Sequence, residues 1–597
     1  MNIYDKNIAL LRNHDPALAR RAEQTLPAIY ALSAKNGLPT LKVQSVYLHS
    51  AYDPESEAKK LVAGFAERAG IPTVVCGLGL GYHLAEILKF TTEDIFVVEP
   101  LMSVFHAFLS SIDLQPFLPR THFLVSEPVP KILTRYSFDS WNVFVHKPSA
   151  QISRKYFTEL EKGGDVADYL ATHPLKALVV NPIYGGSLPT ARFCAKALEN
   201  LGHEVESVQC EDFADSFFAL DKVTRNKQNK DIISALFMNF MSEIIVAKAA
   251  EFQPDLILAL AQAPLTKEAI ARLRVMKIPI AFWFVEDFRT LTYWKDIAPA
   301  YDYLFTIQKG VFFDELESIK VPNYYYLPQA CLPSQHKPVV IEDDEKGKYE
   351  SDFSFMGAAY YNRVQSFPQL IDFKLKIWGT GWDPGSIIGP HLQNEGDRVS
   401  SDECVKIFNG AKINLNLHSS TFHESVNPHG DFINPRTFEI AACSAFQLVD
   451  AREELYDLFN VGEEIVDFKS MDDLKGKISY YLEHEDERVK IAAKGYARVL
   501  REHTMEHRMK EMLIRVYLDN FEDLKKRLDN RKPKIAHLIE QAGADTELGR
   551  YLAQFENAKD FTIKSVVKHI EKGEGALTKN ELLLLMLDEV VKEGANS

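Results

Sequence analysis

Short apolar runs alternate with glycine-containing turns and helical segments along most of the chain. Residues 71–76 (IPTVVC) form one such run, and a turn with glycines at alternate positions, 77–81, follows it. Helical spacing resumes over 82–88, and a second apolar run at 95–98 ends in Glu99 and Pro100. A strand, a turn, a helix and a second strand in this order predict a Rossmann-like βαβ unit.

Two further series of buried strands follow. The first begins with an apolar run at 177–180, a loop and a helix over 189–201, and we expect its later strands at 256–260, 279–285 and 303–307. The second has apolar runs at 352–356, 375–379, 413–418, 446–450 and 464–468. Alternation of this kind is typical of parallel sheets with crossover helices.

The pattern therefore divides the chain into four regions. They are an α/β domain at 1–172, two Rossmann-like domains at 173–335 and 336–528, and a small helical region at 529–597, separated by a break at Lys532 and Pro533. The polar stretch 333–349 is predicted to link the two central domains, and 471–528 is predicted to be helical. Rossmann-like domains bind ligands at the carboxyl ends of their strands, so we expect a cleft between the central domains.

Composition narrows the classes of function. The net charge of −15 disfavours a nucleic acid as partner, because phosphate neutralisation needs clustered cations. The six cysteines contain no C-x-x-C pair, which fits a reducing cytoplasm without disulfides or a zinc ribbon. The first thirty residues lack an apolar leader, and the apolar run at 582–587 is far shorter than the ~20 residues that span a bilayer. We expect neither secretion nor a membrane span.

The strongest candidate for chemistry is the segment from Asp431 to Glu439. Asn434 is a good N-cap and Pro435 a good first helical residue, so a helix with free N–H groups is predicted to begin there. Such an end binds phosphate. Arg436 is placed to meet a diphosphate, and Glu439, one turn further on, to accept hydrogen bonds from ribose hydroxyls. The alternative is an amphipathic helix whose arginine and glutamate are simply solvated.

Two loops of the first central domain are further candidates. Gly185, Gly186 and Ser187 lie between a strand and a helix, where they contact the phosphates of one substrate, contact a second substrate, or form only a tight turn. Glu286 and Asp287 follow an apolar strand, which makes them candidate bases that deprotonate a substrate hydroxyl. Their alternative roles are a helix cap or a salt bridge. His418, His423 and His429 lack the spacing of metal ligands, so no metal site is predicted.

Several motifs of the central region resemble those of CgeB-like glycosyltransferases. They are residues 355–357, Arg363, 375–382 (LKIWGTGW), 412–418 (KINLNLH), 436–442 (RTFEIAA), 446–450 and 503–508, within a resemblance that covers about 177–528. That family has the GT-B fold. The spacing of Asp431 and Glu439 also resembles the E-x7-E element of retaining GT-B enzymes, with aspartate in place of the first glutamate.

The resemblance implies where the substrates bind. The second central domain is expected to hold a nucleotide-sugar donor without a metal or other cofactor, and the first is expected to hold the acceptor. Arg363, which follows the turn at Gly357, and Arg436 are the cations expected at the diphosphate. The loop of Gly379, Thr380 and Gly381 would let the backbone approach the nucleotide base.

The glycine turn near the N-terminus is a separate candidate site. Gly77, Gly79 and Gly81, with Glu99 beyond them, would suit a nucleotide or S-adenosylmethionine whose ribose the acid binds. Two departures count against it: Val75 stands where methyltransferases carry an acid, and Tyr82 where dinucleotide-binding proteins carry glycine.

The first 170 residues better resemble the amino-terminal domain of the motility associated factor (Maf) glycosyltransferases. The resemblance is carried by residues 7–11, 48–58, 77–83 and 97–100. It implies a protein acceptor, such as serine or threonine of flagellin, for a cytoplasmic bacterial glycosyltransferase. Two alternatives stay open, a methyltransferase that uses Gly77 to Gly81 and a non-catalytic interaction protein.

Overall fold

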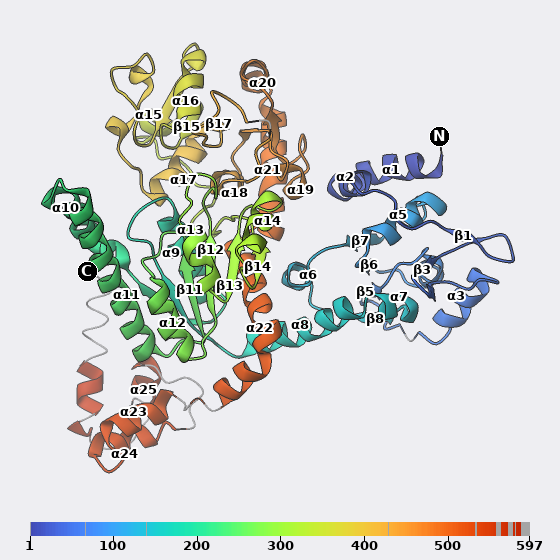
Figure 1. Cartoon of the computed structure of the whole chain (residues 1–597), viewed down its shortest axis with the longest axis horizontal. Coiled ribbons are helices and arrows are strands. Elements are labelled where there is room, and N and C mark those ends of the chain that lie inside the picture. Colours follow the sequence, from blue (N-terminus) through green and yellow to red (C-terminus); the bar gives the residue numbers. More distant parts are fainter. Residues whose placement is uncertain are drawn as a thin grey trace. The chain divides into compact units, whose positions relative to one another are not determined.

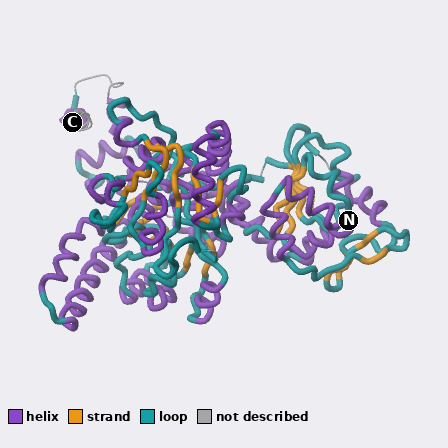
Figure 2. Tube along the Cα trace, turned by 90° about the horizontal axis from the view of Figure 1, so that it is seen from above, coloured by secondary structure: helices purple, strands orange, loops and turns teal. Residues whose placement is uncertain are grey.

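A computed structural model describes the protein over residues 2–586, except 66, 139, 428, 530, 532, 533, 557–562, 571–576 and 580 (Figure 1). The chain forms two compact units, Met1–Asp519 and Asn520–Ser597. The first contains three parallel sheets with helices packed around their strands (Figure 2). The predicted α/β class is confirmed.

The N-terminal domain is built on a four-stranded parallel sheet of order β7-β6-β5-β8. Its strands are β5 (Thr73–Cys76), β6 (Ile95–Glu99), β7 (Thr121–Val125) and β8 (Asn142–Val145). The helices are α1 (Ile3–His14), α2 (Pro16–Gln24), α3 (Pro54–Val62), α4 (Tyr82–Ile87), α5 (Met102–Ser111), α6 (Val129–Arg135), α7 (Lys147–Ile152) and α8 (Arg154–Thr172). Two short hairpins, β1 (Leu32–Ser33) with β2 (Pro39–Thr40) and β3 (Lys42–Val43) with β4 (Val46–Tyr47), precede α3.

The next sheet is six-stranded and parallel, of order β10-β9-β11-β12-β13-β14, and we call it with its helices the first lobe. Its strands are β9 (Lys176–Val180), β10 (Glu204–Val208), β11 (Leu256–Leu260), β12 (Ile280–Phe284), β13 (Tyr303–Thr306) and β14 (Tyr324–Tyr326). Every residue of the central strands β11 and β12 is buried, as continuous apolar runs predict. The α-helices are α9 (Ser187–Asn200), α10 (Ala214–Val223), α11 (Lys227–Phe252), α12 (Lys267–Val275), α13 (Trp294–Ile297) and α14 (Val311–Ser318).

A five-stranded parallel sheet of order β16-β15-β17-β18-β19 forms the second lobe. Its strands are β15 (Ser351–Met356), β16 (Leu375–Trp378), β17 (Ala411–Asn416), β18 (Gln447–Asp450) and β19 (Val466–Phe468). The α-helices are α15 (Lys346–Tyr349), α16 (Tyr361–Ser366), α17 (Ser401–Gly410), α18 (Pro435–Ala442), α19 (Leu455–Leu458), α20 (Met471–Glu483) and α21 (Glu485–Glu502). The predicted linker 333–349 therefore contains a helix, and Ile341 and Tyr349 are buried in an apolar cluster of this lobe.

The helix α22 (Met505–Asp529) returns from the second lobe to the first. Thr504, just before it, pairs with Cys331, and the Arg508 guanidinium donates to the carbonyls of Pro328 and Gln329. Two Rossmann-like lobes tied in this way form the expected GT-B fold. The second compact unit includes α23 (Lys534–Ala542), α24 (Glu547–Ala553) and α25 (Ile563–Ile570); Lys532 and Pro533, the predicted break, lie outside the described residues.

The helix α11 is long and apolar enough, by length and composition alone, to cross a membrane. In this structure 28% of its most apolar window is buried. The sequence pattern did not single it out, because Asn239 and Ser242 interrupt its apolar run. The buried side chains all belong to its second half, for example Met241, Ile245 and Phe252. This half packs on the sheet of the first lobe, whereas apolar side chains of the first half, such as Ile232 and Leu236, are exposed.

Candidate functional site

The carboxyl ends of the strands in the two lobes meet through polar side chains. Arg289, which follows β12, donates two hydrogen bonds to Asp431 of the second lobe, at 3.2 and 2.8 Å. Gln308, which follows β13, donates to the same carboxylate at 2.9 Å and to Asp287 at 3.3 Å. Arg398 of the second lobe donates to the carbonyl of Gly185 at 3.2 Å. The structure thus brings several predicted residues, from segments far apart in the sequence, to one interface.

The predicted helix end at Asn434 is present as the start of α18. The Asn434 side chain accepts from the Thr437 N–H at 3.2 Å, and Pro435 is the first helical residue. The Asn434 N–H in turn donates to His418 Nε2 at 2.9 Å, while His418 Nδ1 lies 2.6 Å from Asp450. The loop that enters the helix is therefore held in place by buried side chains below it.

Buried charges keep this support in a defined protonation state. Burial lowers the pKa of His418 to about 4, so its imidazole is neutral, with Nδ1–H toward Asp450 and Nε2 toward Asn434. Burial disfavours the Asp450 carboxylate, but Arg452, 2.9 Å away, and then His418 outweigh it and lower the pKa of Asp450. An ionised aspartate and a neutral histidine thus position the helix end across the neutral pH range.

Arg436 and Glu439 lie on the same face of α18 and form an ion pair with each other. The Arg436 side chain is one-third exposed, whereas that of Glu439 is 5% exposed and lies 3.7 Å from His336 Nε2. The predicted neighbourhood of a guanidinium and a carboxylate is present. Arg436 lies at one oxygen of the Glu439 carboxylate and His336 at the other, and the predicted contact with a ribose hydroxyl stays untested.

The glycine turns of the second lobe pack against each other. A Cβ on Gly379 (φ +117°) would lie 2.5 Å from the carbonyl oxygen of Gly357, so the close approach of these two backbones requires glycine. Thr380 and Gly381, by contrast, are exposed, and their backbone is accessible to a ligand. Gly381 has φ +81°, and a Cβ there would lie 3.7 Å from Ala359 Cβ, which is an ordinary contact distance.

Arg363 is held by the protein itself. Its guanidinium donates to the Leu417 carbonyl at 3.1 and 2.7 Å and to the Ala358 carbonyl at 2.9 Å, and the residue is 8% exposed. Burial lowers its pKa to about 10, which leaves it charged at neutral pH. In this arrangement its donors hold the loop that follows β17, and its predicted contact with a diphosphate stays untested.

Glu286 is the most perturbed carboxyl at the end of a strand in the first lobe. It is half-buried, and no donor among the described residues forms a hydrogen bond to its carboxyl group. Burial, and secondly the charge of Asp287, raise its pKa to about 7. A carboxyl that ionises near neutral pH and lacks a structural partner has the properties of a general base.

The loop of Gly185, Gly186 and Ser187 lies beside Glu286 in the first lobe. A Cβ on Gly186 would lie 4.0 Å from Glu286 Oε1, whereas a Cβ on Gly185 (φ +110°) would meet Gln262 Oε1 at 2.5 Å. Ser187 is the first residue of α9, and its hydroxyl donates to the Ala261 carbonyl at 3.0 Å. Gly186 therefore borders Glu286 and Gly185 borders Gln262, while Ser187 holds the turn.

The N-terminal glycine turn is filled by the protein's own side chains. The Leu78 and Leu101 N–H groups donate to Glu99 at 2.9 and 3.0 Å, and Glu99 is 1% exposed. Burial raises its pKa to about 7. A Cβ on Gly79 would lie 2.4 Å from His49 Nε2, and one on Gly77 would lie 2.2 Å from Ser149 Cβ. As the side chains lie, the predicted nucleotide position is occupied.

Four residues that the structure places around the predicted site residues were not identified from the sequence. They are Gln262, Arg289, Gln308 and Arg398. Gln262 follows β11 with φ +67°, and its Oε1 atom is buried without a hydrogen-bond partner among the described residues. Position in the chain could have identified three of these residues, because Gln262, Arg289 and Gln308 each follow a buried strand of the same sheet.

Sequence comparisons relate part of the chain to known proteins. Residues 362–514 match a family model described as glycosyl transferase-like. The spore protein CgeB of Bacillus subtilis is 28% identical over 282 residues, which cover 44% of this chain and 85% of CgeB. An uncharacterized protein of Treponema pallidum is 35% identical over 145 residues, 22% of this chain and 49% of that protein.

The similarity to solved structures is more distant. A glycosyltransferase from Rickettsia africae is 14% identical, with TM-score 0.39, over 60% of this chain and 100% of that one. Sucrose-phosphate synthase from Thermosynechococcus elongatus is 12% identical, with TM-score 0.40, over 59% and 100%. Anabaena HepE, solved with UDP and glucose, is 10% identical, with TM-score 0.39, over 59% and 100%.

The sequence comparisons and the two-lobed fold together support a glycosyltransferase. The similarity to CgeB covers 44% of this chain, and that part is CgeB-like. No comparison tests the resemblance of the first 170 residues to Maf proteins, and it stays a prediction.

Proposed function

We propose that this protein transfers a glycosyl group from a nucleotide-sugar donor, held by the second lobe, to a hydroxyl acceptor held by the first. One observation carries the proposal. The capped start of α18, with Arg436 and Glu439 in its first turns, belongs to the same interface between strand ends as the unpartnered carboxyl of Glu286.

The start of α18 supplies the features that a nucleoside diphosphate needs. Free N–H groups and the positive end of the helix dipole favour a diphosphate, and Arg436 adds a cation. Glu439 accepts hydrogen bonds from the ribose hydroxyls. The exposed backbone at Thr380 and Gly381 borders the base.

Glu286 then acts on the acceptor. Its carboxylate takes the proton of the acceptor hydroxyl as the hydroxyl oxygen forms a bond to the anomeric carbon of the sugar. The bond from that carbon to the diphosphate breaks, and the nucleoside diphosphate leaves with the bonding electrons. Asp287, which accepts from Arg289 and Gln308, fixes the turn that presents Glu286.

The proposal extends to partners and conditions. Cationic groups of the protein neutralise the diphosphate, so transfer needs no metal and no other cofactor. The N-terminal domain orients a protein acceptor, such as flagellin, in the cytoplasm, with no role for nucleic acid or a membrane span. Addition of EDTA, Mg²⁺ or Mn²⁺ during an assay should leave the initial transfer rate unchanged; abolition by EDTA with rescue by either ion would contradict this part.

Donor binding provides the direct test. Titration of the full-length protein with UDP-, GDP-, CMP- and dTDP-linked sugars should identify a donor that binds and is slowly hydrolysed. Glu439→Ala should then weaken its binding roughly 5- to 150-fold, since one or two hydrogen bonds are worth about 1 to 3 kcal/mol. Glu463→Ala, on an exposed carboxylate that pairs only with Lys494, is the matched control.

Two results would count against this assignment. Unchanged donor affinity in folded Glu439→Ala protein would remove Glu439 from the site. Absence of binding and hydrolysis with every donor would favour a non-catalytic interaction protein.

A further inference from the structure

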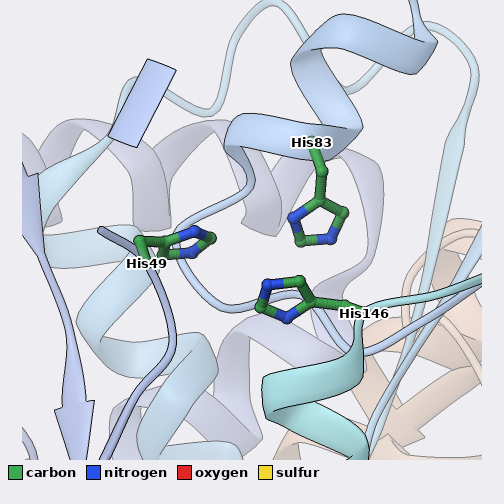
Figure 3. A group of neighbouring side chains, drawn as sticks. All are labelled: His49, His83 and His146. Atoms are coloured by element: carbon green, nitrogen blue, oxygen red, sulfur yellow. The ribbon is translucent and has the colours of Figure 1, made fainter. Parts of the chain in front are cut away.

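Three buried histidines meet at the point where the N-terminal sheet reverses its strand order (Figure 3). In the order β7-β6-β5-β8, the chain builds outward from β5 on one side and returns on the other. His83 lies on α4, which follows the turn after β5, and His146 directly follows β8. His49 comes from the loop after β4. Parallel sheets of this kind bind ligands at such a crevice.

The ring nitrogens are close, and two of them lack partners. One nitrogen from each ring lies within 4.8 Å of the others. His83 Nε2 lies 2.9 Å from the Gly77 carbonyl, and His146 Nδ1 lies 2.7 Å from the Ser149 hydroxyl. The opposite nitrogens, His83 Nδ1 and His146 Nε2, are buried without a hydrogen-bond partner among the described residues.

The three imidazoles carry no charge, so one nitrogen of each ring has a lone pair. The three residues are 2%, 0% and 1% exposed. Burial lowers the pKa of His83 to about 4 and those of His49 and His146 well below their ordinary value, so all three imidazoles are neutral. Neutral imidazole is the form that ligates metals, and ligands usually hold their other nitrogen on a carbonyl or a similar group. His83 meets this pattern with a carbonyl and His146 with a hydroxyl.

We propose that His49, His83 and His146 bind one transition-metal ion, with Zn²⁺ as the best candidate. Three nitrogen ligands suit Zn²⁺ and do not suit Mg²⁺ or Ca²⁺, which take oxygen ligands. Three histidines leave the fourth position of a tetrahedral Zn²⁺ to a water molecule. Because the three residues are buried, we assign the ion a structural role, as a clamp that joins the loop after β4, the helix α4 and the start of α7. No substrate-sized opening is needed for that role.

Binding requires a modest rearrangement of the rings. Zinc–nitrogen bonds of about 2.0 to 2.1 Å at tetrahedral angles bring ligand nitrogens to about 3.3 Å from each other. The rings of His83 and His146 now stack at 4.3 Å between centroids with 13° between their planes, so they must turn about the Cβ–Cγ bond to share an ion. His49 Nε2 accepts from the Leu80 N–H at 2.7 Å, so that ring must turn or give up this bond.

Metal analysis of tag-free, full-length protein tests the proposal without any activity assay. We expect about one equivalent of zinc by mass spectrometry of the purified protein. After the metal is removed, addition of Co²⁺ should produce a visible ligand-field absorption, and Zn²⁺ should bind with a dissociation constant below about 1 µM. His83→Ala and His146→Ala should abolish the absorption and weaken Zn²⁺ binding at least about 100-fold.

Matched controls separate the cluster from other histidines and from misfolding. His122→Ala, in β7 of the same domain, removes a half-exposed imidazole beside Asp94 and should bind Co²⁺ as the unmodified protein does. Zn²⁺ should raise the thermal midpoint of the unmodified protein and of His122→Ala, but not that of His83→Ala or His146→Ala. Circular dichroism checks that each variant is folded.

The proposal is overturned by absence of tight Zn²⁺ or Co²⁺ binding to the unmodified protein. It is equally overturned if folded His83→Ala and His146→Ala bind these ions as well as His122→Ala does. Neither result depends on the proposed glycosyl transfer.

Discussion

Two glycine turns, each after a parallel strand, differ in what surrounds them. The turn of Gly77, Gly79 and Gly81 in the N-terminal domain is entirely buried, and His49 and Ser149 occupy the space beside its glycines. The loop of Thr380 and Gly381 in the second lobe is exposed, and no side chain crowds Gly381. From the sequence alone, both are candidate nucleotide-binding loops.

The difference shows that the spacing of glycines indicates close packing against the backbone. It does not show whether a ligand or a side chain of the protein packs there. In the N-terminal domain, the neighbour is a histidine from the chain itself, and the nearby Glu99 is satisfied by backbone N–H groups. In the lobes, the groups at the strand ends include the carboxyl of Glu286, to which no described residue donates a hydrogen bond, and the capped end of α18. We therefore place transfer chemistry at the lobes and a structural role at the N-terminal turn.

Replacement of Glu286 tests the chemical side of this comparison and has the largest expected effect. Glu286→Gln should lower the transfer rate about 10²- to 10⁴-fold, the usual contribution of a general base, with donor affinity unchanged. Glu268→Gln, on an exposed part of α12, is the control. A transfer rate within a few-fold of the unmodified protein would exclude Glu286 as the base.

The same residue predicts how the rate depends on pH. The pKa of Glu286 is raised to about 7 by burial, and a base acts only when it has lost its proton. The rate should therefore rise with pH up to about 7 and level off above it. This rising limb should vanish from the residual activity of Glu286→Gln, and its persistence there would assign it to another group.

Paired glycine replacements test the packing side of the comparison. Gly79→Ala places a Cβ against His49 at a positive φ, so we expect a loss of about 2 to 4 kcal/mol in the stability of the N-terminal domain. Gly381→Ala meets only the strain of its positive φ, about 1 to 2 kcal/mol. Thermal unfolding measures both.

Donor binding should respond in the opposite order. Gly381→Ala should weaken it several-fold, whereas Gly79→Ala should leave it unchanged at temperatures where the variant is folded. Loss of donor affinity in folded Gly79→Ala would mean that the N-terminal turn takes part in the site after all.

Local pattern was enough to predict the central strands, since fully buried parallel strands read as continuous apolar runs. The run at 256–260 is β11 without any shift, and the predicted cap at Asn434 begins α18. The edge strand β10 was missed because it carries glutamate and serine among its residues and is only half-buried. A continuous apolar run identifies a strand that is buried on both faces, and the edge strand β10 is not buried in this way.

Long-range contacts could not be predicted in the same way. Arg363 was expected at a diphosphate, yet its guanidinium is held by a carbonyl 54 residues away, at Leu417. His49 enters a turn that begins 28 residues later in the chain, and nothing in the local spacing of either segment encodes that contact. The lobes' interface is similar, because Arg289 and Asp431 are 142 residues apart.

The pair of Arg289 and Asp431 provides the last and smallest prediction. Its side chains are 44% and 27% exposed, so the ion pair itself should contribute less than about 1 kcal/mol. If Asp431 contacts the donor, as the resemblance of its spacing with Glu439 to the E-x7-E element implies, Asp431→Asn should weaken donor binding about fivefold and Arg289→Gln less than about twofold. A double-mutant cycle on the full-length protein separates the two effects. Equal losses in both single variants, with a coupling energy above about 1 kcal/mol, would instead show that Asp431 acts by joining the lobes, and the donor contact would then rest on Arg436 and Glu439 alone.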